Sequence, residues 1–377
     1  MVYLDYSATT PVHKEVLDSF CNTCASFIGN SNSLHSLGID AHKLENQATK
    51  QICDLLGVSD FDIIYTSGSS ESNNTAIKGI CEKYQNRGKK IITTNLEHSS
   101  IYGPLGFLQR HGFEVEIVNT LENGLVDMDH LKSLLSDQVV LVTIASVNSE
   151  TGLLQPIDEI GLLVKNYPKC YFHVDMTQSI GKVSIPFRYI DLVSFSAHKF
   201  YGIKGIGVLL KRKGIMIEPL IHGGKSTTIY RSGTPALPLI VSLSKALRLS
   251  LQSLEEHYQI VDKYHTMITE KLRCYDHVHI NSNESCIPHI INFSVDFVKP
   301  ETLQHALEEY NIFISTQSAC SSGNAISKAV LEVTKDEVYA SHSVRVSLSH
   351  LTTETEIQTF LDAFDCCYKR FYNLYEV

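Results

Sequence analysis

Two apolar segments in the middle of the chain end in side chains suited to amine chemistry. Lys199 lies between the apolar residues 190–195 and a glycine-rich turn that leads into residues 206–210. A lysine at a strand end of an α/β sheet is partly desolvated and faces the ligand crevice, so its amine becomes a better nucleophile. Asp175 ends another apolar segment, residues 171–175, a short distance upstream. An isolated Ser-x-His-Lys match fits an ordinary loop lysine better than a catalytic one, so the interpretation depends on the pair.

The pair predicts a pyridoxal phosphate site. This cofactor needs a lysine for a Schiff base and a carboxylate that keeps the ring nitrogen protonated, so that the ring can accept electrons. Ser69 and Ser70 are candidate phosphate ligands, because they lie between an apolar segment and a helix, where free backbone N–H groups and the helix dipole favour an anion. A capped helix start without any ligand is the alternative for these two serines.

Two further strand ends carry polar residues where turn residues would suffice. His98 follows the predicted strand 90–94 and could stack on a flat cofactor or move protons. Asn148 follows the predicted strand 139–147 and could donate a hydrogen bond to a phenolic oxygen. The alternatives are a structural histidine for the first residue and a turn residue for the second.

The C-terminal third carries a cysteine and an arginine in distinctive settings. Cys320 is flanked by small residues and glycine within residues 315–324, which predicts an exposed loop. Exposure and a nearby cationic cofactor would lower the pKa of this thiol below its ordinary value of about 8.5 and so favour the thiolate. Arg345 lies in a predicted short strand, and its fork of donors suits the carboxylate of an amino acid. A structural ion pair is the alternative for Arg345.

The composition excludes several classes of protein. The chain has 377 residues, of which 43% are hydrophobic, so it can bury a large core and two domains are expected. A net charge of −9 without any basic block argues against nucleic acid or an anionic membrane as the main partner. The N-terminus lacks a secretory pattern, and no apolar run approaches the roughly 20 residues that span a bilayer. We therefore expect a cytoplasmic protein.

The ten cysteines have no regular spacing and do not describe a disulfide framework. We interpret most of them as core residues. Cys21 and Cys24 form a C-x-x-C pattern, but no second pair follows at zinc spacing, so no metal site is expected.

The order of elements predicts an α/β fold. Apolar segments alternate with helical ones from residue 61 onward, which indicates a mostly parallel sheet covered by helices on both faces. A helix is expected over residues 72–84, after the serine-rich turn. A long helical stretch, residues 239–274, then leaves this unit and enters a smaller α/β unit with strands near 290–295 and 312–315.

With these motifs in hand, the chain resembles the cysteine desulfurases of the class V aminotransferase family, the NifS/IscS-like group that serves nitrogenase and general iron–sulfur cluster assembly. The resemblance covers nearly the whole chain, and its motifs lie at residues 4–11, 66–72, 97–98, 173–179, 194–202, 231–234, 318–320 and 345–348. It implies the type I fold of pyridoxal phosphate enzymes, with a seven-stranded sheet in a large domain, residues 11–251. Residues 1–10 and 252–377 would form the small domain that carries the active cysteine.

The resemblance also implies a role for each candidate residue. Lys199 would form the Schiff base, Asp175 would pair with the ring nitrogen, and His98 would stack on the ring. Gln178 and Asn148 would contact the ring oxygen, and Arg345 would bind the substrate carboxylate. The phosphate would be held by Ser69, Ser70, Ser196, His198 and, from the other subunit of a homodimer, Thr234.

The implied reaction converts L-cysteine to L-alanine and leaves a persulfide on Cys320, from which sulfur passes to an acceptor protein of iron–sulfur assembly or of tRNA or cofactor thiolation. Two alternatives stay open. One is another pyridoxal phosphate enzyme of this fold, such as a selenocysteine lyase or an aminotransferase, and the other is a catalytically idle platform for sulfur transfer. Several positions depart from the family pattern without removing a catalytic group: Ser149, Ala197, Ile203, residues 225–230 and Gln317. They suggest a specialised member.

Overall fold

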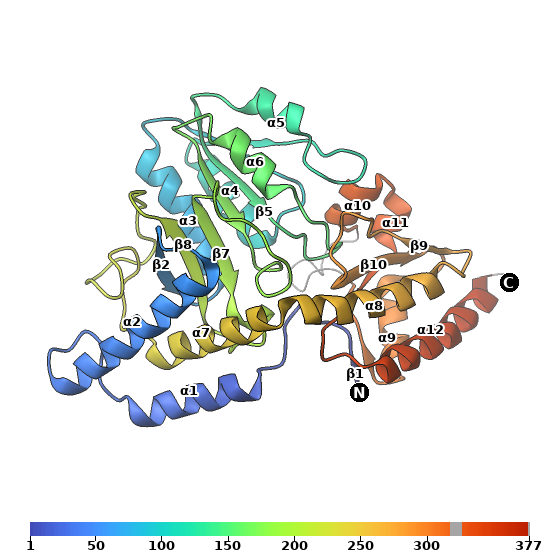
Figure 1. Cartoon of the computed structure of the whole chain (residues 1–377). Coiled ribbons are helices and arrows are strands. Elements are labelled where there is room, and N and C mark those ends of the chain that lie inside the picture. The colour runs from blue at the N-terminus through green and yellow to red at the C-terminus, as the bar shows by residue number, and fades with distance from the viewer. Residues whose placement is uncertain (317–325, 376–377) are drawn as a thin grey trace.

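The larger part of the protein is built around a seven-stranded sheet (Figure 1), in a computed structural model that describes residues 1–316 and 326–375. The strands of this sheet are β2 (Phe61–Thr66), β3 (Lys90–Thr93), β4 (Glu114–Ile117), β5 (Val139–Ala145), β6 (Tyr171–Asp175), β7 (Leu192–Ser196) and β8 (Gly207–Arg212). Their order is β2-β8-β7-β6-β5-β3-β4, and only β8 runs against its neighbours. The predicted α/β fold with a mostly parallel sheet is confirmed.

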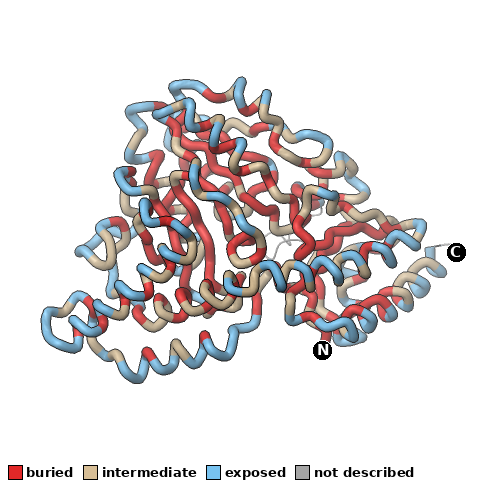
Figure 2. Tube along the Cα trace, viewed as in Figure 1, coloured by how far each residue is buried: buried red, intermediate tan, exposed pale blue. Residues whose placement is uncertain are grey.

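Both faces of this sheet are covered by helices, as its sequence requires. Strands β5 and β7 are buried at nearly every residue, which is typical of strands that have no face toward water. One face packs against α2 (Ser36–Leu56), α5 (Met128–Leu134), α6 (Ile157–Val164) and α7 (Leu237–Gln252), and the other against α3 (Ser69–Tyr84) and α4 (Ser99–Arg110). Helix α1 (Lys14–Ser26) lies outside, on α7. Figure 2 shows the resulting buried layer of strands between exposed helical surfaces.

The smaller part has its own sheet and core. Strands β9 (Val278–Ile280), β10 (Ile290–Val295) and β12 (Ser343–Ser347) form an antiparallel sheet, while β1 (Val2–Tyr3) pairs with β11 (Ile312–Phe313). The helices of this part are α8 (Leu254–Leu272), α9 (Pro300–Glu308), α10 (Lys328–Thr334), α11 (Glu337–Ser341) and α12 (Glu354–Tyr375). Because β1 joins this unit, the first residues of the chain lie beside its last third (Figure 1).

Two helix boundaries differ from the prediction. The stretch predicted as one helix over residues 239–274 is two helices that follow each other nearly in line, α7 and α8 (Figure 1), and Ser253 breaks them with φ −117° and ψ 23°. A serine hydroxyl competes for local backbone groups, which weakens a helix interior. Helix α3 begins at Ser69 rather than at residue 72, because Gly68, with φ +156°, directs the chain into the helix three residues earlier. Ser69 and Ser70 therefore form the first turn of α3.

The cysteines are less buried than predicted. Among the nine that the structure describes, Cys81, Cys170 and Cys367 are buried, while Cys21, Cys24, Cys274 and Cys366 are exposed, so the interpretation as core residues is wrong for these four. The exposed ones lie on outer faces of α1 and α12 or just past the end of α8, where a small apolar side chain costs little. No described cysteine forms a disulfide. Within residues 1–316 and 326–375, no helix is long and apolar enough to cross a membrane.

Candidate active site

Most of the predicted site residues surround one cavity of about 210 Å³ at the carboxyl ends of the parallel strands. Ligands of open α/β sheets bind at this edge. The predicted residues that line it are Ser69, Ser70, His98, Asn148, Asp175, Gln178, His198, Lys199 and Arg345. They come from six separate segments of the chain, so the fold brings together what the sequence spreads over nearly 280 residues.

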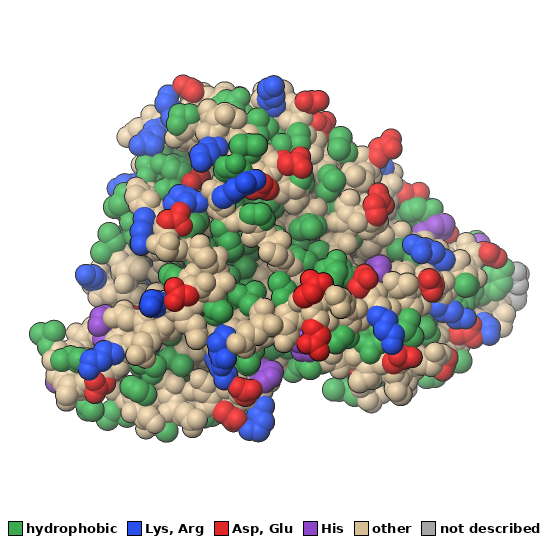
Figure 3. All heavy atoms as spheres, in the orientation of Figure 1, with side chains coloured by type: hydrophobic (Ala, Val, Ile, Leu, Met, Phe, Trp, Pro, Cys, Tyr) green, Lys and Arg blue, Asp and Glu red, His purple; other side chains and the backbone are tan. Residues whose placement is uncertain are grey.

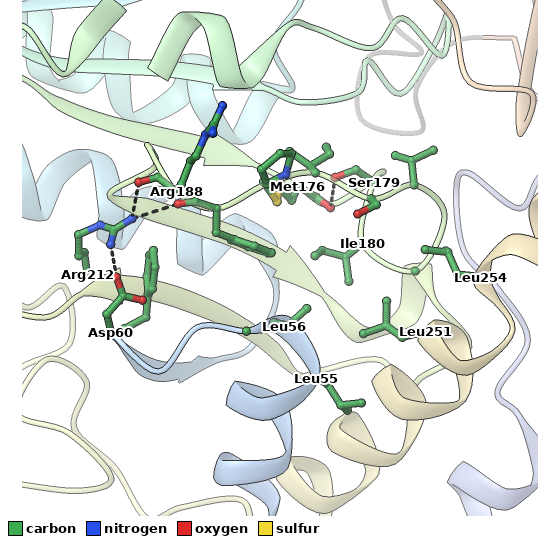
Figure 4. A pocket seen from close by; sticks show the side chains of 18 residues that line it. Leu55, Leu56, Asp60, Met176, Ser179, Ile180, Arg188, Arg212, Leu251 and Leu254 are labelled. Atoms are coloured by element: carbon green, nitrogen blue, oxygen red, sulfur yellow. Dashed lines mark hydrogen bonds and ion pairs between the residues drawn. The ribbon is translucent and has the colours of Figure 1, made fainter. Parts of the chain in front are cut away.

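A larger cavity, of about 490 Å³, contains none of these residues (Figure 4). It lies on the other side of the turn that follows β6 and is lined mainly by apolar side chains such as Leu55, Ile180 and Leu251. Its arginines are already neutralised, since Arg212 pairs with Asp60 and Arg188 pairs with Asp158. The smaller cavity therefore carries the chemistry, because nucleophile, carboxylate and imidazole converge there.

Lys199 is held at the cavity by the first residues of the chain. It ends a short 3₁₀ turn after β7, and its Nζ donates to the carbonyl oxygens of Ser7 and Ala8 at 2.6 and 2.7 Å. Tyr201, two residues further on, adopts the left-handed φ of +64°, and its N–H donates to Thr10 Oγ1 at 2.8 Å. The residues of the segment 7–10 thus fix both the lysine amine and the turn that carries it.

Asp175 ends β6 with its side chain 6% exposed, and both carboxylate oxygens accept hydrogen bonds. Oδ1 accepts from the backbone N–H of Thr177 at 2.9 Å, and Oδ2 accepts from Asn73 Nδ2 at 2.8 Å. The two donors fix the orientation of the carboxyl group. The residue can therefore face a protonated ring nitrogen.

The two histidines of the cavity are held neutral by their surroundings. His98 is the N-cap of α4, where its Nδ1 accepts from the N–H of Ser100 at 3.1 Å, and burial lowers its pKa. Burial, followed by the charge of Lys199, lowers the pKa of His198 to about 4, and its Nδ1 is 3.2 Å from Thr9 Oγ1. A neutral imidazole can donate a hydrogen bond to an anion or lie against an aromatic ring.

One end of the cavity fits a phosphate group. Helix α3 has no side-chain cap at Gly68, so the N–H groups of its first turn, at Ser69 and Ser70, lie at an uncapped, positive helix end. Ser196 is buried and does not line the cavity, but it lies next to this turn. A Cβ atom added to Gly68 would be 3.5 Å from Ser196 Oγ. Two buried hydroxyls of cavity residues, Ser7 Oγ and Thr177 Oγ1, have no partner among the described residues. The donor set and these hydroxyls fit pyridoxal phosphate.

Arg345 and Asn148 line the cavity but also bond to the protein. Arg345 is 1% exposed; it pairs with Asp5 at 2.8 Å and donates to the carbonyl oxygen of Ser149 at 2.9 Å, so the ion pair considered from the sequence is present. Its Nε has no partner among the described residues. Asn148 Oδ1 accepts from Thr151, and its Nδ2 donates to the carbonyl oxygen of Leu96 at 2.8 Å. Both residues thus organise the turns around the cavity.

Besides Ser196, one described residue of the predicted site does not line the cavity. Thr234 is exposed and is not among the lining residues, and its expected place in a partner subunit stays a prediction. Cys320 lies outside the described residues. Within the described part of the chain, no group of three or more candidate ligands could hold a metal ion.

The sequence reasoning missed the lining residues Ser7 and Thr177. It also missed Asn73, Ser100 and Lys182, which hydrogen-bond to site residues without lining the cavity. Asn73 and Ser100 lie in the first turns of α3 and α4, two helices whose N-termini both follow predicted strand ends. Lys182 Nζ donates to Gln178 Oε1 at 2.6 Å, and Gln178 Nε2 donates to the carbonyl oxygen of Ser7 at 2.8 Å. Residues 177–182 form turns and not a helix, so the spacing of these two residues was no signal for this contact.

The burial of Lys182 predicts that the free energy of unfolding depends on pH. Burial, then the charges of Lys199 and Arg345, lower its pKa from 10.5 to about 7. Between these two values the unfolded chain binds more protons at this site than the folded chain, so the free energy of unfolding rises with pH by at most about 1.4 kcal/mol per unit. We expect Lys182→Met to remove this rise, measured by urea unfolding at pH 6 to 10. The exposed Lys132→Met is the control, and an unchanged slope in Lys182→Met would contradict the assignment.

The comparisons with known proteins agree with the geometry. A family model described as Aminotransferase class-V matches residues 2–360. The chain is 39% identical to a NifS/IcsS protein homolog of Lactobacillus delbrueckii subsp. bulgaricus, with 98% of each chain covered. It is 36% identical to the cysteine desulfurase IscS of Dictyoglomus turgidum, covering 97% of this chain and 93% of that protein. The solved structure of a NifS-like protein matches with a TM-score of 0.92 and 32% identity, over 98% of this chain and 99% of that chain.

Proposed function

The chain belongs to the class-V aminotransferase family, and on this premise we propose that it is a pyridoxal phosphate-dependent cysteine desulfurase of the NifS and IscS type. The observation that carries the proposal is the convergence of Lys199, Asp175, His98 and Arg345 on one cavity. An amine, a carboxylate, a neutral imidazole and a guanidinium are the groups that this chemistry needs from the protein.

The proposed reaction transfers sulfur from free L-cysteine to a thiol of the protein. L-cysteine and the Cys320 thiol become L-alanine and a Cys320 persulfide: the substrate C–S bond breaks, an S–S bond forms, and the proton of the Cys320 thiol is retained in the products. When bound, the cofactor supplies an electron sink next to the substrate Cα. Arg345 binds the substrate carboxylate, and Lys199 removes and returns the proton at Cα.

Residues of the cavity would hold the cofactor by its two ends. Asp175 would face the ring nitrogen and His98 the ring face, with Gln178 and Asn148 near the ring oxygen. Ser69, Ser70, Ser196 and His198 would hold the phosphate at the N-terminus of α3. The uncapped helix end and the unpartnered hydroxyls of Ser7 and Thr177 support this placement.

We propose that the active species is a homodimer in which the partner subunit supplies Thr234 to the phosphate. Apolar side chains lie exposed on and around α1 and α2, where Ile28 is 81%, Leu34 93% and Leu37 53% exposed. Figure 3 shows hydrophobic atoms at the end of the molecule where these two helices meet. A second chain would cover such a surface. Sedimentation equilibrium measures the mass directly, and a monomer at micromolar concentration would refute the dimer.

The small domain, residues 1–10 and 252–377, would bring Cys320 to the cavity and carry the persulfide away. Arg345 on β12 and the segment that holds Lys199 already belong to these residues, so the small domain forms part of the cavity wall. We propose that the sulfur then passes to an acceptor protein of iron–sulfur assembly or of tRNA or cofactor thiolation.

Incubation with L-cysteine tests the function. We expect the purified protein to form alanine and a protein-bound persulfide, measured by amino-acid analysis and by intact mass, with a gain of one sulfur atom. Cys320→Ser should lose the persulfide and lower alanine formation by about 10²-fold or more, since the covalent acceptor is gone. The exposed Cys274→Ser is the matched control. Sulfide release at the full rate by Cys320→Ser would favour a lyase instead, and absence of bound cofactor would favour the idle platform.

A further inference from the structure

Four side chains form a continuous hydrogen-bonded chain from Asp175 to His98. Asn73, buried in the first turns of α3, donates from Nδ2 to Asp175 Oδ2 at 2.8 Å and to Ser100 Oγ at 2.9 Å. Ser100 Oγ is 2.8 Å from His98 Nδ1. The chain crosses behind the cavity from β6 through α3 to α4, so it links the residue proposed to face the ring nitrogen with the residue proposed to lie on the ring.

The direction of every bond in this chain is determined. The Asp175 carboxylate can only accept, so Asn73 must present its NH₂ group and not its oxygen. Consistently, the buried Asn73 Oδ1 has no partner among the described residues. The second N–H of Asn73 makes Ser100 Oγ an acceptor, which leaves the hydroxyl proton of Ser100 free to be donated to His98 Nδ1.

A second donor reaches the same atom. The backbone N–H of Ser100 donates to His98 Nδ1 at 3.1 Å, and a backbone N–H cannot accept. Nδ1 of His98 must therefore be unprotonated, and the single proton of the neutral ring lies on Nε2. His98 Nε2 has no hydrogen-bond partner among the described residues, and the side chain lines the cavity.

We propose that Asn73 and Ser100 are positioning residues that fix His98 as its Nε2–H tautomer, so that it offers a hydrogen-bond donor, and not a base, to the molecule in the cavity. The inference deepens the proposed function and rests on it for the identity of that molecule. Burial is the largest influence on His98 and lowers its pKa. Asp175 and Glu150 favour protonation of the ring, whereas Lys199 opposes it and so acts in the same direction as burial. A neutral ring of one tautomer follows.

Ser100→Ala tests the proposal, with Ser99→Ala as the matched control, because Ser99 is the exposed neighbour on the same turn. The full-length protein, labelled with ¹⁵N-histidine, is studied by NMR without cysteine, and the His98 signals are identified by their loss in His98→Gln. In the wild type we expect a protonated Nε2 and an unprotonated Nδ1. Loss of the hydroxyl donor in Ser100→Ala should raise the proton affinity of His98 about three- to tenfold. Ser100→Thr, which keeps the hydroxyl, should restore the wild-type value.

Two results would overturn the proposal: a wild-type His98 with its proton on Nδ1, or a proton affinity in Ser100→Ala equal to that in Ser99→Ala. Neither measurement involves turnover of cysteine. A protein that forms no alanine but shows the Nε2–H tautomer would refute the desulfurase and leave the positioning role intact, while the reverse outcome would refute only the positioning role.

Discussion

Lys199→Ala is expected to lower alanine formation from L-cysteine by about 10²- to 10⁴-fold, the range in which a positioned acid–base group contributes to catalysis. Its Nζ is held by the carbonyl oxygens of Ser7 and Ala8 at the cavity. Lys182, a buried amine of this region, is engaged with Gln178 and does not line the cavity. Amino-acid analysis over hours gives the residual rate, and borohydride treatment followed by mass spectrometry shows whether any cofactor is still fixed to the protein.

The control for this variant is Lys204→Ala, an exposed lysine of the same loop that does not line the cavity. It should keep the wild-type rate and the covalently fixed cofactor. In Lys199→Ala the carbonyl oxygen of Ser7 still accepts a hydrogen bond from Gln178 Nε2. The free energy of unfolding of the variant should therefore differ from that of the wild type by no more than about 1 kcal/mol. A folded Lys199→Ala protein with more than a tenth of the wild-type rate would show that another amine does the chemistry.

The sequence was sufficient to predict the strands of the large sheet and the polar residues at their ends, because a local pattern of residues determines both. Strands β5, β6 and β7 are runs of apolar residues bounded by polar ones, so their positions and the polar groups at their ends could be read directly. The residues that line the cavity follow from this, because parallel strands bring their carboxyl ends to one edge. The motifs between residues 4 and 348 also identified the family, which the family model confirms.

The contacts between distant segments could not be predicted. Asn73 meets Asp175 across 102 positions, and Lys199 meets Ser7 across 192, and nothing in the local sequence of either pair specifies the partner. The break at Ser253 was missed because the apolar pattern continues across it and only the backbone conformation changes. The four exposed cysteines were misjudged because an apolar side chain at a surface position leaves no local signal.

Asp175→Asn is expected to lower the rate of alanine formation by about 10²- to 10³-fold, the loss that follows removal of one preorganised electrostatic contact. An amide cannot keep the ring nitrogen protonated, so the electron sink weakens while the shape of the side chain is conserved. Because this carboxylate is not proposed to contact the substrate, kcat should fall and KM should change little. The control is Asp191→Asn, a partly buried carboxyl group that accepts from the N–H of Phe172 and lies outside the cavity.

The double variant Asp175→Asn/Ser100→Ala separates the two tasks of Asp175. If the carboxylate acts only on the ring nitrogen, the two losses multiply, as they do for independent sites. In the hydrogen-bonded chain, however, the acceptor at Asp175 is what makes Asn73 present its NH₂ group to Ser100, so an amide at position 175 already disturbs the donor to His98. We therefore expect the rate loss of the double variant to be smaller than the product of the single losses. A strictly multiplicative result would mean that Asp175 and His98 work independently in spite of the side chains that join them.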